Sequence, residues 1–130
     1  MALSITAIYA GLLGLIAIVL AAMVGRARVA TGVSLGDAGR PALLVAMRRQ
    51  ANFVEYVPLF VVLLAIVEIN GAPRWWLHTL GSIVVAARII HPFGLRHDVM
   101  RTIPRFLGTV GTFLPIVALS LTALWTAFLR

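Results

Sequence analysis

Three side chains suited to binding an anionic ligand lie close together in the middle of the chain: Arg48, Asn52 and Glu55. Their spacing of i, i+4 and i+7 places them on one face of an α-helix, which repeats every 3.6 residues. The guanidinium group can pair with a carboxylate, and the amide and the carboxylate can hold polar or charged nitrogen atoms. This polar face comes just before a strongly apolar run, so its groups need partners or a ligand inside the fold.

The composition around these residues is that of an integral membrane protein. Of 130 residues, 62% are hydrophobic and only 12% are charged, with a mean hydropathy of +1.04. The chain has no cysteine, so disulfides, thiolate metal ligands and a cysteine nucleophile are excluded, and any thiol chemistry must use a thiol from outside. The net charge is +7 and every basic residue is arginine. Most arginines flank apolar segments, which favours lipid headgroups or an anionic ligand over nucleic acid.

Apolar runs and helix-breaking residues predict one domain, 1–130, with four transmembrane helices at about 3–24, 41–69, 74–91 and 103–129. The first run lacks a basic start and is too long for a signal peptide, so we interpret it as a retained helix. Pro41 suits a first helical turn, and the sequence Asn70-Gly71-Ala72-Pro73 predicts a tight turn. Pro92 is expected to end the third helix at His91. The fold class is therefore an all-α integral membrane protein, an up-down-up-down four-helix bundle.

Arginine is concentrated in the connections that follow the first and third helices. By the positive-inside rule both of these connections are cytoplasmic, and both termini lie on the non-cytoplasmic side. Only 12 residues separate Glu55 from Glu68, and only 13 separate Arg74 from Arg88, whereas a crossing needs about 20. The middle helices must therefore carry polar groups into the cytoplasmic half of the bundle. The expected groups at this depth are Asn52, Glu55, Arg88, His91 and, opening the fourth helix, Arg105.

Ionisable groups at that depth should face one another or a wet cavity, because each costs about 2.5 to 3.5 kcal/mol to insert. One interpretation is structural: an ion pair of Glu55 with Arg88, bridged by Asn52. The other is an anion pocket, since one carboxylate cannot neutralise Arg48, Arg88 and Arg105 together. The three histidines do not share one helix face at metal-ligand spacing, so no metal site is expected. The spacing alone leaves the ion pair and the anion pocket open.

Three motifs resemble the membrane-associated proteins in eicosanoid and glutathione metabolism, the MAPEG family. They are Arg48-x-x-x-Asn52-x-x-Glu55-Tyr56-x-Pro58 in the second helix, Arg88-x-x-His91 in the third, and Arg101-x-x-Pro104-Arg105 at the start of the fourth. The resemblance covers the whole chain in length, helix layout and motif order. The second-helix motif is the most specific part of it.

This resemblance implies a homotrimer of four-helix subunits in a bacterial-type inner membrane. Catalytic family members bind glutathione between subunits, in the cytoplasmic half of the bilayer, and use it on lipophilic substrates. By resemblance, the glutathione-binding set is Arg26, Arg48, Asn52, Glu55, Arg88 and His91. Arg105 resembles the arginine that stabilises the glutathione thiolate, which increases the fraction of the attacking species. The implied function is a glutathione transferase or peroxidase acting on a lipophilic small molecule.

Three positions depart from the pattern of glutathione-binding relatives. Leu95 stands where a tyrosine is usual, and Phe106 and Thr109 stand where one relative has a serine and a tyrosine. The family also contains a non-catalytic lipid-binding member, so a lipid-binding or scaffold protein of the same fold is the alternative. A small proton-coupled carrier that uses Glu55 and His91 is a third hypothesis.

Overall fold

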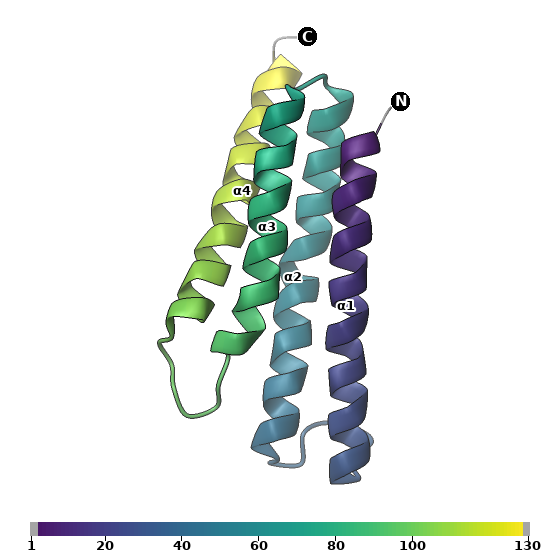
Figure 1. The fold of residues 1–130 in the computed structure, drawn as a ribbon, viewed down its shortest axis with the longest axis vertical. Helices are drawn as coiled ribbons and strands as arrows, with labels where there is room; N and C mark the ends of the chain where they lie inside the picture. Colours follow the sequence, from purple (N-terminus) through teal and green to yellow (C-terminus); the bar gives the residue numbers. More distant parts are fainter. Residues whose placement is uncertain (1–2, 129–130) are drawn as a thin grey trace.

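The computed structural model describes residues 3–128, and the regular structure of these residues is entirely helical. Helix α1 spans Ser4–Thr31, α2 spans Pro41–Ile69, α3 spans Arg74–Gly94 and α4 spans Ile103–Phe128. The helices run alternately down and up, so α1 begins and α4 ends at the same end of the bundle (Figure 1). The connections 32–40 and 95–102 lie together at the opposite end, which we call the arginine-rich end (Figure 1). The predicted four-helix layout is confirmed.

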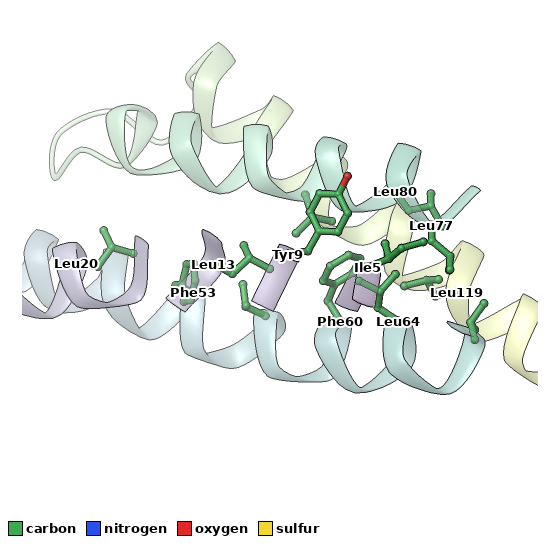
Figure 2. Close-up of a cluster of buried hydrophobic side chains, with 13 residues drawn as sticks. Ile5, Tyr9, Leu13, Leu20, Phe53, Phe60, Leu64, Leu77, Leu80 and Leu119 are labelled. Carbon is green, nitrogen blue, oxygen red and sulfur yellow. The ribbon is translucent and has the colours of Figure 1, made fainter. Parts of the chain in front are cut away.

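Three of the helices, α1, α2 and α4, are long and apolar enough to cross a membrane. The remaining helix, α3, has 21 residues and packs against each of the other three, whereas the backbones of α1 and α4 do not approach each other closely within residues 3–128. The main core lies between these helices, toward the end where α1 begins, and Phe60, Leu64 and Leu77 are almost fully buried there (Figure 2). The helices that carry the predicted site residues are therefore held together by apolar packing at the end of the bundle opposite the arginine-rich end.

Helix α1 is longer than the apolar pattern predicted. It ends at Thr31 rather than at about residue 24, so Arg26 and Arg28 lie on its last two turns and not in a connection. The reason is tertiary packing, because Ala27 of α1 packs against the cluster that Val24 forms with Leu43 and Ala46 of α2. The helix ends where Gly32 adopts a left-handed conformation with φ of 68°, which glycine tolerates without strain.

Helix α3 also continues past its predicted end, through Pro92 to Gly94. A proline in the last turn removes only one backbone hydrogen bond, and the carbonyls that follow are satisfied by side chains. The Thr102 hydroxyl donates to the Gly94 carbonyl at 2.7 Å, and Arg49 donates to the Leu95 carbonyl at 3.0 Å. These bonds stabilise three further residues of helix. At the other end of the chain, the predicted limit of the fourth helix, residue 129, falls outside the described residues.

Close contact between α3 and α4 depends on glycine. A Cβ atom at Gly108 would stand 2.8 Å from the Cα atom of His91 and 3.0 Å from the Ala87 carbonyl oxygen, and it would collide with the His91 Cβ atom. A Cβ at Gly94 would likewise meet the backbone of Arg105. These two glycines therefore set the spacing between the helix that carries His91 and the helix that carries Arg105.

The far end of the bundle is held by polar ties to α1. The Glu68 carboxylate accepts hydrogen bonds from the backbone N–H groups of Ile5 and Thr6 at 2.8 and 2.7 Å, and from the Thr6 hydroxyl at 2.6 Å. The carboxylate therefore caps the first turn of α1, and its negative charge interacts favourably with the positive end of the helix dipole. The Tyr9 ring stands between α1 and α3, with its hydroxyl donating to the His78 carbonyl at 2.9 Å (Figure 2).

Candidate functional site

A cavity of about 410 Å³ opens between α2, α3 and α4 at the arginine-rich end, and we call it the polar pocket. Helix α2 contributes one wall, the last turns of α3 and the connection that follows contribute the second, and α4 contributes the third. The residues that line it are Leu44, Val45, Arg48, Asn52, Tyr56, His91, Leu95, Arg96, His97, Arg105, Thr109 and Phe113. Three arginines and two histidines are among them, and no carboxylate is.

Four of the seven predicted site residues meet at this pocket: Arg48 and Asn52 from α2, His91 from α3 and Arg105 from α4. They come together because α2 and α4 pack against α3 and against each other. His91 is only 2% exposed, and the Gly108 contact fixes its backbone against α4. As predicted, polar groups from three helices therefore lie together at one end of the bundle.

Glu55 does not form the ion pair with Arg88 that one interpretation required. Its carboxylate lies 3.5 Å from the Arg48 guanidinium on the same helix, and both side chains are about half exposed. Glu55 is exposed and does not line the polar pocket. The predicted Glu55–Arg88 ion pair is therefore wrong within this chain.

Arg88 is instead buried behind the pocket. Only 2% of the residue is exposed, and its Nη1 atom donates to the Oδ1 atom of Asn52 at 2.9 Å. This bond orients the Asn52 amide, so that Arg88 positions a residue of the polar pocket without lining the pocket itself. The Nε atom of Arg88 is buried and has no hydrogen-bond partner within residues 3–128.

Arg26 is not brought to the pocket by the fold of one subunit. It lies exposed near the end of α1, and no α1 residue lines the polar pocket, because α1 and α4 sit on opposite sides of the bundle. Within residues 3–128 the structure therefore does not bring Arg26 together with the other predicted site residues.

Arg105 lies between two cavities. It lines the polar pocket and also a neighbouring cavity of about 710 Å³ whose other walls include Met100, Ile103 and Phe106. Its Nη1 atom donates to the Met100 carbonyl at 3.0 Å, which holds the side chain near the start of α4. The guanidinium thus stands at the boundary between a polar and a largely apolar space.

The sequence prediction omitted two α2 residues that belong to this region. Tyr56 lines the polar pocket, and its ring packs on Phe113 with centroids 4.9 Å apart. Arg49, beside Arg48, joins α2 to the end of α3 through Leu95. The available signals were the aromatic ring next to Glu55 and the second arginine three residues before Asn52, a spacing that adjoins the same helix face.

The positions that depart from the family pattern also lie here. Leu95 and Thr109 line the polar pocket, but leucine has no hydrogen-bonding group and the Thr109 hydroxyl donates to the Arg105 carbonyl at 2.9 Å. Phe106 is exposed and faces the neighbouring cavity. The pocket therefore gains no free hydroxyl from these three residues.

Comparison with known proteins identifies relatives along nearly the whole chain. The MAPEG family model matches residues 6–125. The inner membrane protein YecN of Escherichia coli strain K12 is 34% identical over 121 residues, which cover 93% of this chain and 91% of that protein. The YecN protein of Escherichia coli O6:H1 strain CFT073 matches to the same extent. No solved structure gives a significant match. These relatives and the apolar helices support an integral inner membrane protein.

Proposed function

The chain belongs to the MAPEG family, and from this we propose that it is a membrane glutathione transferase or peroxidase acting on lipophilic electrophiles. The observation that carries the proposal is the polar pocket, in which Arg48, Asn52, His91 and Arg105 converge from three helices. Glutathione is a net anion with two carboxylates and one ammonium group. The pocket is lined by three guanidinium groups, and the Glu55 carboxylate lies 3.5 Å from the Arg48 guanidinium, an arrangement that complements this charge distribution.

The position of Arg105 suggests how the bound thiol would react. A guanidinium beside the sulfur favours the thiolate, which is the nucleophilic form. The neighbouring cavity past Met100, Ile103 and Phe106 is largely apolar and suits the lipophilic substrate. In a transferase reaction the thiolate would form a C–S bond to an electrophilic carbon, and the displaced group would leave with the bonding electrons. In a peroxidase reaction two thiols would reduce a hydroperoxide to an alcohol and water and become a disulfide.

We further propose that the site is completed in a homotrimer. Arg26 lies on α1, away from the pocket of its own subunit, and can reach an equivalent pocket only in a neighbouring one. The α1 face that carries Gly11, Gly14 and Gly25 meets no other part of the chain at those glycines. Small residues on an open helix face allow another helix to approach closely in a membrane. Mass measurement of the protein in detergent tests the assembly, and a monomer that binds glutathione would contradict it.

The function is tested by glutathione binding and thiolate formation in detergent-purified protein. We expect equilibrium dialysis to detect bound glutathione, and ultraviolet difference spectra to show thiolate absorbance that Arg105→Ala removes. Arg40→Ala is the matched control, because Arg40 is exposed at the same end of the bundle and lines neither cavity. Absence of glutathione binding at millimolar concentration would refute the proposal.

A non-catalytic lipid-binding or scaffold role is the second candidate. The observation in its favour is that Leu95 and Thr109 present no free hydroxyl to the polar pocket. This role predicts that lipid co-purifies in the subunit grooves and that no thiolate signal develops when glutathione is added. The two candidates are therefore distinguished by the same difference spectrum.

A further inference from the structure

A second groove runs along the opposite side of α2, between α1 and α3, and has a volume of about 350 Å³. Its walls are apolar side chains of α1 and α3, among them Val19, Met23, Ile89 and Phe93. Its polar lining consists of two arginines, Arg49 from α2 and Arg88 from α3, and no acidic residue lines it. The groove is separate from the polar pocket, with which it shares no lining residue.

Both arginines have a guanidinium nitrogen that is buried without a partner. The Nε atoms of Arg49 and Arg88 are shielded from solvent, and their N–H groups donate no hydrogen bond within residues 3–128. Each guanidinium uses another nitrogen elsewhere, Arg49 on the Leu95 carbonyl and Arg88 on Asn52. Buried donors that lack an acceptor are costly, and native proteins rarely leave them so. Two such donors in one groove call for an acceptor that carries negative charge.

We propose that this groove binds an anionic phospholipid, with its phosphate on Arg49 and Arg88 and one acyl chain along the apolar walls. The depth fits this ligand. Arg49 contacts the residue that follows the end of α3, and Arg88 lies six residues before that end, about 9 Å along the helix at 1.5 Å per residue. The phosphate would therefore lie toward the arginine-rich end of the bundle, and the acyl chain would follow the apolar part of the groove toward its middle.

The shape of the groove favours a lipid over a free anion. Nearly all its lining is hydrocarbon, and Val19 and Phe93 are exposed on the outer face, so that an acyl chain can continue past the groove into the bilayer. A free phosphate would leave this apolar surface uncovered. The proposal does not depend on glutathione chemistry, although Arg88 connects the two regions because it also holds Asn52 of the polar pocket.

Native mass spectrometry of the full chain, purified in a neutral detergent, tests the proposal. Phosphatidylglycerol and phosphatidylcholine are added in equal amounts, and we expect retained phosphatidylglycerol to predominate. Arg49→Gln should weaken its retention about tenfold, as expected for the loss of a charge-assisted hydrogen bond. Val19→Trp, which fills the groove without changing its charge, should weaken retention as well.

Matched controls separate the groove from general effects. Arg40→Gln removes the same charge at the same end of the bundle, and Ile18→Trp enlarges an exposed α1 side chain that does not line the groove. Both should retain phosphatidylglycerol like the unmodified protein. Equal retention of the two lipids, or full retention by Arg49→Gln and Val19→Trp, would overturn the proposal. Displacement of the lipid by an equal concentration of inorganic phosphate would overturn it too. So would a change in oligomer mass caused by Val19→Trp, which would assign the groove to contacts between copies.

Discussion

A methyl group added at Gly108 would strike the part of α3 that carries His91. The nearest atoms to the new Cβ would be the Cβ of His91, then its Cα at 2.8 Å and the Ala87 carbonyl oxygen at 3.0 Å. Carbon atoms in ordinary contact are about 3.5 to 4.0 Å apart, so the two helices would have to separate by about 1 Å. All three atoms belong to a helix backbone or are attached directly to it, and no flexible side chain can move aside to accept the methyl group.

Separation of the helices should lower the stability of the protein moderately and its activity more strongly. Overpacking of this kind costs about 1 to 3 kcal/mol. Arg105 lies three residues before Gly108 on α4, and His91 lies on α3, so separation of the helices widens the polar pocket between them. A misplacement of about 1 Å can reduce catalysis about 100-fold. We therefore expect Gly108→Ala to lower the thermal midpoint in detergent and to weaken glutathione binding.

The matched control is Ala127→Val. Ala127 lies on the same helix, but its side chain is exposed near the opposite end of α4 and lines neither cavity. Substitutions at exposed positions usually change stability by less than about 0.5 kcal/mol, so this control should leave the thermal midpoint nearly unchanged. The reasoning is refuted if Gly108→Ala matches Ala127→Val in both thermal midpoint and glutathione affinity.

Three further substitutions test the polar contacts. Glu68→Gln should lower the thermal midpoint by the equivalent of about 1 to 2 kcal/mol, because the amide keeps one acceptor for the start of α1 but loses the charge. Asp98→Asn, at an exposed ion pair of 3.6 Å, should have little effect on the midpoint. Asn52→Ala removes the acceptor that Arg88 uses and should cost about 2 to 3 kcal/mol in the same assay. Leu95→Tyr adds a hydroxyl at the wall of the polar pocket and should tighten glutathione binding, measured by equilibrium dialysis, several-fold.

A specific result would contradict each of these three predictions. Equal thermal midpoints for Glu68→Gln and Asp98→Asn would mean that the Glu68 cap contributes nothing to stability. For Asn52→Ala the control is Gln50→Ala, which removes a neighbouring amide that makes no side-chain hydrogen bond within residues 3–128. If both variants melt alike, Arg88 has another partner. Unchanged or weaker glutathione binding by Leu95→Tyr would place the ligand away from that wall.

The number, order and approximate limits of the helices follow from the sequence because each depends on local properties. Apolar runs set the length of the spans, and Pro41 and the turn at 70–73 set boundaries that the structure confirms. The limits that failed depend on distant residues. Helix α1 extends to Thr31 because Ala27 packs against the cluster formed with α2, and α3 extends to Gly94 because Thr102 and Arg49 satisfy carbonyls at its end. No local pattern in either segment contains that information.

The candidate site, too, could be predicted only in part, because some of its contacts depend on how the helices pack. The period of α2 correctly groups Arg48, Asn52 and Glu55, but it does not say on which side of that group α3 lies. The structure places α3 on the Asn52 side, so that Arg88 bonds to Asn52 and Glu55 is left on the outer edge with Arg48. A periodic pattern gives angles around one helix, whereas the partner of a buried charge depends on how two helices are rotated against each other.

The same rotation explains why two neighbouring arginines serve different cavities. At about 100° per residue, Arg49 points well away from Arg48 around α2, with Asn52 between them. Arg48 therefore lines the polar pocket, and Arg49 lines the groove between α1 and α3. Asn52 lines the polar pocket and accepts a hydrogen bond from Arg88, which lines the groove, so this bond connects the two cavities. An anion bound to the Arg88 Nε atom would hold the guanidinium in place and with it the Asn52 amide. Lipid in the groove and glutathione in the pocket would then stabilise the same arrangement of Arg88, and each should tighten the binding of the other. Equal glutathione affinities in phosphatidylglycerol and in phosphatidylcholine nanodiscs would show that lipid binding in the groove and glutathione binding in the pocket are not coupled.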